Sequence, residues 1–204
     1  DKHISSVNID NTKAAYEATQ YLVKKGHRHI IYATGPAGKA LSQDRLNGFL
    51  QSAKENRLML LENSIMPCGF LFNDGYWCMK RILQQSPNAT AVLFSNDISA
   101  YGAYHAANDE GLCIPGDLSI MGIDRLATMI DLSIFMPDLS TMTHPTSELG
   151  INAAKLLIHK INGEKETEQI TLNCTLYPGS TVRDISGIEA ARQKEKAGEG
   201  AGQA

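Results

Sequence analysis

Two polar side chains stand at the ends of two strands predicted in the middle of the sequence. Residues 89–124 read as strand, helix and strand, with Asn96 ending the first strand and Asp124 the second. A parallel β-α-β unit brings both ends to one sheet edge, where open α/β sheets bind ligands. An amide that donates and accepts and a carboxylate that accepts from two hydroxyls together suit a polyol. The alternatives are an amide bonded to local backbone and a turn-forming aspartate.

Three further side chains are candidates for the same edge. Arg45 lies near the start of a helix predicted at about 43–56, just after a loop of small residues, and its fixed donors suit ligand oxygens. Lys39 belongs to that loop and is a second cationic candidate. Phe70 follows a short strand predicted at 64–66, and its ring could stack on the apolar face of a sugar or on a base.

Structural alternatives accompany these candidates. Arg45 could form a surface ion pair with Asp44 or Glu55 instead of binding a ligand. Phe70 could be ordinary packing, and Phe72 competes with it for the stacking role.

Other polar groups favour structure over chemistry. Asp97 immediately precedes the helix predicted at about 98–110, so we expect it to be the N-cap. Residues 35–39 (GPAGK) have the residue types of a phosphate loop but not its spacing, and residues 27–29 (HRH) are expected to be a surface turn that feeds a strand. His144 is a strand-end histidine without a nucleophile in reach. We therefore expect no catalytic set, no metal site and no cofactor.

Apolar periodicity predicts alternating strands and helices, and hence an α/β fold with a doubly wound parallel sheet. The expected helices span residues 12–25, 43–56, 75–85, 98–110 and 147–162; the expected strands span 7–10, 29–33, 64–66, 118–123, 139–143 and 170–176, besides the one that ends at Asn96. Residues 187–204 are rich in alanine, glycine and charge, which predicts a disordered tail.

Composition narrows the possible function classes. A chain of 204 residues with 43% hydrophobic content suits one domain, and its net charge of −3 argues against a direct grip on a phosphate backbone. No apolar run approaches the roughly 20 residues that span a bilayer, so no membrane partner is expected. The four cysteines form no C-x-x-C pair, which indicates free thiols and a cytoplasmic location. The chain begins with Asp1, so we expect a cut or processed N-terminus.

Taken in order, the motifs resemble those of the effector-binding domain of the LacI/GalR family of bacterial transcription regulators. The most telling match is the run DLSIMGID at residues 117–124. The other matching stretches are colinear with it and include VNIDN (7–11), KGHRHI (25–30), DRLNGF (44–49), ATAV (89–92), SND (95–97), PDLST (137–141) and VRD (182–184).

The resemblance implies a fold like that of type I periplasmic binding proteins, in which two α/β lobes close on a small effector. It implies a sugar or related polyol as effector, with a purine less favoured, and a homodimer that reads operator DNA through a helix-turn-helix. Arg45, Asn96 and Asp124 match positions that family members use on the effector. Phe70 matches the aromatic loop position, and Lys39 falls at a position that varies in the family.

The chain also departs from the family pattern. We expect the helix-turn-helix and the first part of the N-terminal lobe to lie outside this chain. Residues 1–186 then correspond to a partial sensor domain, mainly the C-terminal lobe with returning elements of the N-terminal lobe. The helix at 147–162 would return to the absent lobe, so its apolar face is expected to be unmatched. Arg125 replaces a residue that is often acidic in relatives, which leaves the ligand class open.

Two functions therefore stand side by side. The first is a DNA-binding transcriptional regulator represented by its effector-sensing portion. The alternative is a sugar-binding protein of a transport system, which shares the fold. An enzyme is not expected.

Overall fold

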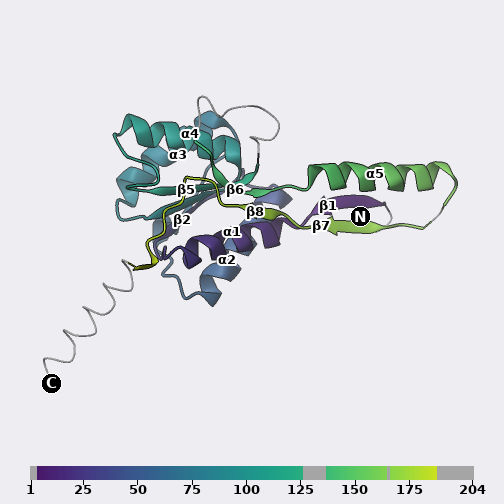
Figure 1. The fold of residues 1–204 in the computed structure, drawn as a ribbon, viewed down its shortest axis with the longest axis horizontal. Coiled ribbons are helices and arrows are strands. Elements are labelled where there is room, and N and C mark those ends of the chain that lie inside the picture. The colour runs from purple at the N-terminus through teal and green to yellow at the C-terminus, as the bar shows by residue number, and fades with distance from the viewer. Residues whose placement is uncertain (1–3, 126–136, 165, 188–204) are drawn as a thin grey trace, which may run out of the picture.

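The main body of the protein is a six-stranded sheet, seen in a computed structural model that describes residues 4–125, 137–164 and 166–187 (Figure 1). Neighbouring strands are parallel, except that β8 runs antiparallel to β6. In spatial order the strands are β3 (Ile65–Met66), β2 (Ile30–Ala33), β4 (Ala91–Phe94), β5 (Ser119–Asp124), β6 (Ser140–Thr143) and β8 (Thr175–Tyr177). The predicted doubly wound α/β architecture is confirmed.

Two helices cover each face of this sheet. Helices α1 (Asn11–Lys24) and α2 (Ala40–Glu55) pack on one face, and α3 (Phe72–Gln85) and α4 (Asp97–Asp109) on the other (Figure 1). Strands β2 and β4 are buried along their whole length, because central parallel strands are covered on both sides. None of the helices in the described ranges is long and apolar enough to cross a bilayer.

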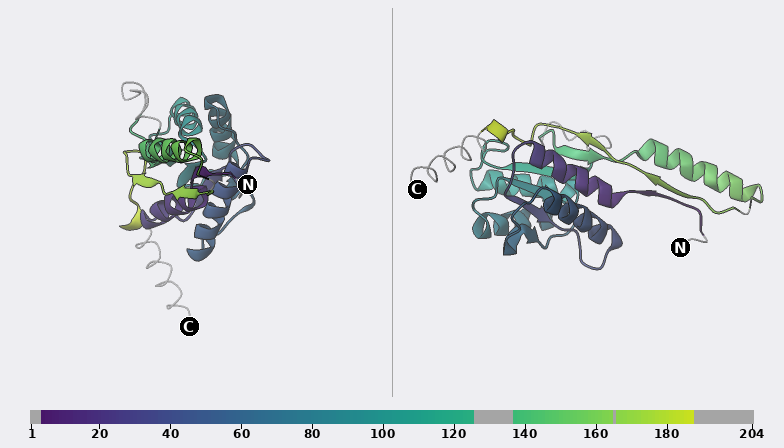
Figure 2. Two further views of the ribbon diagram at one scale, coloured as in Figure 1. Left: turned by 90° about the vertical axis from the view of Figure 1, so that its right-hand side faces the viewer. Right: turned by 90° about the horizontal axis from the view of Figure 1, so that it is seen from below.

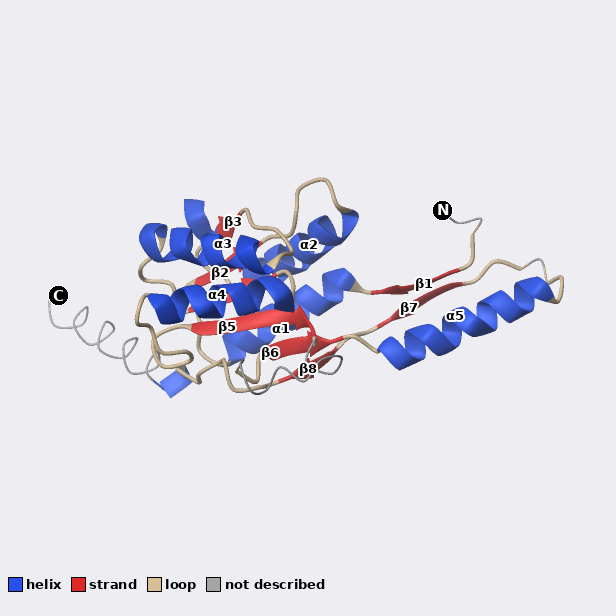
Figure 3. Ribbon diagram, turned by 90° about the horizontal axis from the view of Figure 1, so that it is seen from above, coloured by secondary structure: helices blue, strands red, loops and turns tan. Residues whose placement is uncertain are grey.

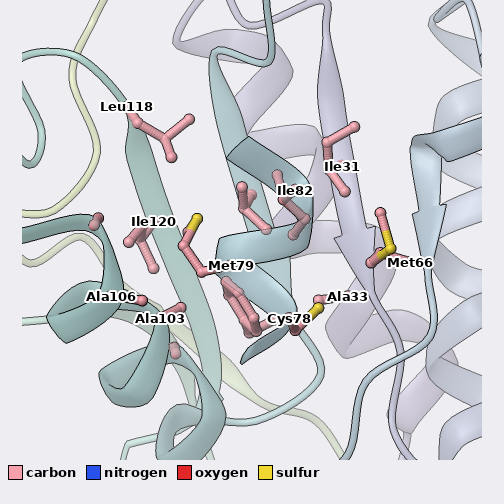
Figure 4. Packing of buried hydrophobic residues seen from close by; sticks show 14 of the residues in the cluster. Ile31, Ala33, Met66, Cys78, Met79, Ile82, Ala103, Ala106, Leu118 and Ile120 are labelled. Carbon is pink, nitrogen blue, oxygen red and sulfur yellow. The ribbon is translucent and has the colours of Figure 1, made fainter. Parts of the chain in front are cut away.

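The core under α3 and α4 relies on close helix approach as well as on apolar side chains (Figure 4). Met79 and Ile82 are fully buried there, as their helical spacing predicts. A Cβ on Gly75 would lie 1.8 Å from a backbone oxygen of α4, and one on Gly102 would lie 1.9 Å from a backbone oxygen of α3. The two helices therefore touch backbone to backbone, at positions where any side chain would force them apart.

An arm projects from this body, made of β1 (Ser6–Ile9), β7 (Gln169–Leu172) and α5 (Thr146–Ile161) (Figures 1 and 2). Strands β1 and β7 form a separate parallel two-stranded sheet, and α5 contacts β1. Leu156 is the one buried residue of α5, whereas Ile161 is 73% exposed. The expectation that this helix carries an unmatched apolar face is confirmed.

The strand predicted at 170–176 is wrong as a single element. The structure divides it into β7, which pairs with β1 in the arm, and β8, which pairs with β6 in the body (Figure 3). The break falls at Asn173 and Cys174, where the chain passes from one sheet to the other. Alternation of apolar residues reports that a segment is extended, but not which partner it finds. A short 3-10 turn (Glu62–Ser64) precedes β3, and most of the predicted tail, residues 188–204, lies outside the described residues.

His27 is buried rather than part of a surface turn, which corrects a second expectation. Its side chain is 1% exposed, with Nδ1 3.0 Å from Thr90 Oγ1 and Nε2 3.1 Å from the carbonyl oxygen of Arg183. The backbone N–H of Ile185 donates to the Lys25 carbonyl at 2.7 Å, so the end of the described chain is fastened beside α1. Burial lowers the pKa of His27 to about 4.

The exposed face of α5 predicts that the 204-residue chain self-associates. Leu157, Ile158 and Ile161 are each more than half exposed, and clustered apolar surface favours association. Replacing Leu157 and Ile161 by lysine should lower the sedimentation coefficient toward that of a monomer. Met59→Lys, an equally exposed site on the body, is the control and should leave association unchanged. A monodisperse wild-type monomer with one cooperative unfolding transition would contradict this prediction.

The burial of His27 predicts loss of stability in mild acid. Its pKa is lower in the folded chain than the ordinary 6.5, so the unfolded chain binds more protons between about pH 4 and 6.5. The free energy of unfolding should therefore fall as the pH drops through this window, by about 3 kcal/mol at its lower end. Urea unfolding at several pH values measures this. His27→Gln should flatten the profile, whereas the exposed-site control His159→Gln should keep it; a flat wild-type profile would refute the assignment.

Candidate functional site

A cavity of about 390 Å³ opens at the carboxyl edge of the main sheet. Asp124 ends β5, Asn96 follows β4, and His144 follows β6, so three neighbouring strands each deliver a polar side chain. The complete lining is Leu41, Arg45, Phe70, Asn96, Asp124, His144 and Thr146. The structure thus brings together four of the five side chains proposed from the sequence.

Arg45 lines this cavity and is only 1% exposed. Its Nε donates to Asn11 Oδ1 at 3.0 Å, and one terminal nitrogen donates to the Ser95 carbonyl. The other terminal nitrogen donates to Asp124 Oδ1 at 3.1 Å and lies 3.3 Å from His144 Nε2. The surface ion pair considered for Arg45 is therefore wrong: its carboxylate partner is Asp124, at the end of β5. A buried guanidinium needs such partners, because burying a charge without hydrogen bonds or an ion pair is costly.

Asp124 supplies the carboxylate of the site, and its surroundings have opposing effects on its pKa. Burial raises its pKa, while Arg45 and His144 lower it. Its backbone φ is +136°, in the left-handed region that favours glycine, and Asp tolerates such a conformation better than most residues. Local strain of this kind persists only where surrounding contacts hold it. With its side chain 28% exposed, Asp124 remains open to a ligand from the cavity side.

His144 belongs to the site although the sequence did not point to it. Its Nε2 lies 3.3 Å from Asp124 Oδ1, and burial lowers its pKa even though the Asp124 carboxylate raises it. The signal that could have found it is its place directly after β6, the neighbour of β5 in the sheet. Without the order of the strands, the sequence places His144 at the end of a strand but not beside Asp124.

Asn96 lies at the cavity but is also fastened to the protein. It is the N-cap of α4: its Oδ1 accepts from the Ser99 N–H at 3.1 Å and from Ser99 Oγ at 2.6 Å. Its Nδ2 donates to the carbonyl oxygen of Phe70 at 2.9 Å. The second hydrogen of Nδ2 is the donor that a ligand could use.

Asp97 is not the N-cap, which corrects the expectation from the sequence. The helix starts one residue earlier than predicted, so Asp97 is its first residue and Asn96 caps it. Asp97 is buried, and its Oδ1 accepts from Thr141 Oγ1 of β6 at 2.7 Å. Its carboxylate thus ties α4 to the sheet.

Phe70, rather than Phe72, is the aromatic residue at the cavity. A Cβ on Gly35 would lie 2.3 Å from the Phe70 ring, so the ring rests directly against the glycine backbone. Phe72 begins α3 and packs against His105, with ring centroids 5.3 Å apart. Phe70 therefore lines the cavity from the loop before α3, whereas Phe72 belongs to α3 and is not part of the lining.

Lys39 stands apart from the other four candidates. It is exposed and lines a neighbouring cavity of about 510 Å³, formed by the loop before α2.

Within the described ranges no cluster of histidine, cysteine and acidic side chains could hold a metal ion. The cavity lined by Arg45, Asn96, Asp124 and Phe70 combines a carboxylate, flanking donors and an aromatic ring. Such a combination is suited to binding a hydroxyl-rich small molecule.

Comparisons with known proteins identify a family that matches most of the chain. A family model described as a periplasmic binding protein-like domain matches residues 19–182. The HTH-type transcriptional repressor PurR of Pasteurella multocida is 33% identical over 183 residues, 90% of this chain and 53% of that protein. The PurR of Klebsiella pneumoniae is 35% identical over 178 residues, 86% of this chain and 51% of that protein.

Solved structures are similar over the same part of the chain. A LacI family transcriptional regulator from Enterococcus faecium with bound ribose has a TM-score of 0.79 and 28% identity, covering 88% of this chain and 66% of that one. A complex of the transcriptional regulator CelR with cellobiose has a TM-score of 0.80 and 25% identity, covering 88% of this chain and 54% of that one. The chain spans about half the length of the curated relatives it matches.

The buried guanidinium predicts a large stability loss in Arg45→Met. This change leaves the Asp124 carboxylate and the Ser95 carbonyl without their donor, and breaking a buried pair costs about 3–5 kcal/mol. Urea unfolding at neutral pH measures the loss. The exposed Arg57 provides a matched control, since Arg57→Met should change the free energy of unfolding by less than about 0.5 kcal/mol. Equal losses in the two variants would show that the Arg45 contacts contribute nothing special.

Proposed function

The chain belongs to the family of periplasmic binding protein-like domains, and on that premise we propose that it is the effector-sensing portion of a DNA-binding transcriptional regulator of the LacI type. The observation that carries the proposal is the cavity where Asp124, Arg45 and Phe70 meet at the carboxyl edge of the sheet. Relatives at 33–35% identity are named as repressors, which supports regulation over catalysis.

The proposed effector is a sugar or related polyol. Asp124 accepts hydrogen bonds from two neighbouring hydroxyls, Asn96 supplies a donor, and the Phe70 ring covers an apolar sugar face. Arg45 serves the effector through the Asp124 carboxylate, to which it donates from its buried position. Ribose and cellobiose are bound in two of the similar structures, which supports this class. A purine, which could also stack on Phe70, is the less favoured choice. Lys39 could reach only a ligand that extends into the neighbouring cavity.

The proposed mechanism is a linkage between effector and operator DNA. Thr146 lines the cavity and is also the first residue of α5, so the site adjoins the chain that leads into the arm. A ligand that contacts His144 or Thr146 can favour one orientation of the arm relative to the body. Effector and DNA then prefer different arrangements, and each changes the affinity of the other. The proposed partners are operator DNA, through a helix-turn-helix outside this chain, and a second copy in a homodimer.

A sugar-binding protein of a transport system is the second candidate, because the fold and the site suit it equally well. The free thiols at Cys68, Cys78, Cys113 and Cys174 favour the regulator, which works in a reducing cytoplasm. The sequence upstream of this chain decides between the two: a helix-turn-helix supports the regulator, and a secretory signal supports the transport protein.

A thermal-shift screen of sugars, polyols and nucleobases on the full-length protein tests the proposed site. A ligand that binds only the native state raises the melting temperature, and at a hundredfold excess over Kd the gain is about 2.7 kcal/mol. We expect a sugar or polyol to give the shift, and Asp124→Ala to abolish it.

Asp44→Ala is the matched control, because Asp44 is exposed on α2 and does not line the cavity. This variant should keep the full ligand-induced shift. An unchanged shift in Asp124→Ala would mean that the ligand binds elsewhere, and a shift with nucleobases alone would replace the sugar by a purine.

A further inference from the structure

Three chain crossings join the arm to the body of the molecule (Figures 1 and 3). The chain passes from β1 to α1 at Asp10, from β6 to α5 at residues 144–145, and from β7 to β8 at residues 173–174. A change in the orientation of the arm relative to the body has to be taken up at these crossings, because such motions are absorbed by a few residues at the ends of elements. Side chains that bind a crossing therefore influence the arm.

The buried guanidinium of Arg45 contacts two of the three crossings as well as the cavity. Its Nε donates to the side-chain oxygen of Asn11 at 3.0 Å, directly after the first crossing. One terminal nitrogen lies 3.3 Å from Nε2 of His144, at the second crossing. The same terminal nitrogen donates to Asp124 Oδ1 at 3.1 Å. Because a guanidinium is planar and rigid, a shift at its Asp124 end also changes the direction of the Nε–H bond.

Asn11 uses both ends of its side-chain amide. Its Oδ1 accepts from Arg45, and its Nδ2 donates to the carbonyl oxygen of Ile9 at 3.2 Å. Ile9 ends β1 and pairs with Leu172 of β7, and the backbone N–H of Asp10 donates to the Leu172 carbonyl oxygen at 2.9 Å. The Asn11 amide thus joins the buried cation to the two-stranded sheet of the arm. An amide accepts from a cation and donates to a carbonyl at once, which an ionised carboxylate cannot do.

We propose that Asn11 is a positioning residue that transmits the state of the Asp124 carboxylate, through Arg45, to the arm. An effector hydroxyl that binds Asp124 competes with Arg45 for the carboxylate, and the guanidinium adjusts its position. Asn11 follows the Nε–H bond and moves the Ile9 carbonyl, so the end of β1 changes direction relative to α1. The proposal rests on the proposed function for its ligand, but the connection belongs to the free protein and is testable without an effector.

Amide NMR of the 204-residue chain tests this connection, with Asp124→Asn as the change at the cavity. Asparagine has the shape of aspartate and tolerates the positive φ at this position, but it lacks the charge. All spectra use the Leu157→Lys, Ile161→Lys background, which removes much of the exposed apolar surface of α5. We expect Asp124→Asn to shift the side-chain amide resonances of Asn11 and the backbone amide resonances of residues 9–10.

Asn11→Asp separates transmission from a purely local role at the start of α1. This change keeps an acceptor for the guanidinium and removes the donor to the Ile9 carbonyl oxygen. In its background, Asp124→Asn should leave the backbone amides of residues 9–10 unshifted. The backbone amide of Asn96 should still shift, because it belongs to the peptide group whose carbonyl oxygen accepts from the same guanidinium. The pair of changes forms a double-mutant cycle.

Asn8→Asp is the matched control, because Asn8 is exposed on β1 and its side chain bonds within that strand. In this background the response of residues 9–10 to Asp124→Asn should persist. If Asp124→Asn does not fold, Arg45→Lys replaces it, since lysine keeps the charge but not the fixed Nε donor. Residues 9–10 should then shift with Asn8→Asp and stay in place with Asn11→Asp.

The proposal is overturned if the amides of residues 9–10 do not respond to the change at the cavity. It is also overturned if they respond equally in the Asn11→Asp and Asn8→Asp backgrounds, because the signal would then bypass the Asn11 amide. The failure of every sugar in the thermal-shift screen would leave these spectra unchanged, so failure of the proposed function and failure of this proposal are distinguishable.

Discussion

The buried guanidinium of Arg45 is the interaction on which the rest of the site depends. Its acceptors come from the start of α1 (Asn11), the residue after β4 (Ser95) and the end of β5 (Asp124), and His144, after β6, lies 3.3 Å from the same guanidinium. A charge buried to this degree is tolerated only when its donors are matched, so the four segments must hold their relative positions. The contacts that hold Arg45 at the cavity therefore also fix the relative positions of the strand ends at this edge of the sheet.

These contacts explain how the Asp124 carboxylate can be held in place and still be open to a ligand. Asp124 sits in a strained backbone conformation, and the contacts from Arg45 and His144 hold its side chain toward the cavity. A ligand hydroxyl that reaches Asp124 adds to this arrangement from the open side, because one carboxylate accepts several hydrogen bonds. The other polar group, Asn96, caps α4 with its side-chain oxygen and donates from its side-chain nitrogen to the Phe70 carbonyl oxygen. One side chain therefore connects the start of α4 to the loop that carries Phe70.

The arm gives the molecule its asymmetry. Its helix begins at the cavity with Thr146 and ends at Ile161, far from the body, with most of its apolar side chains exposed (Figure 2). In the proposed regulator the arm is the physical connection between effector and the remainder of the protein.

Local patterns in the sequence were enough to predict the α/β class, the parallel sheet implied by alternating elements, and the strand-end positions of Asn96 and Asp124, because apolar periodicity and strand-end polarity are local properties. The folded structure was needed to show that Arg45 is buried against Asp124, that His144 joins them, and that Asn96 rather than Asp97 caps α4. It also decided that one predicted strand serves two sheets and that Lys39 faces another cavity. The burial of Arg45, the position of His144 and the division of the strand depend on contacts between segments far apart in the chain, whose partners are set by packing and by the need to satisfy buried charge. The cap of α4 is a local contact between Asn96 and Ser99, but two neighbouring residues, Asn96 and Asp97, were both suited to it by type, and only the backbone conformation at the helix start distinguishes them.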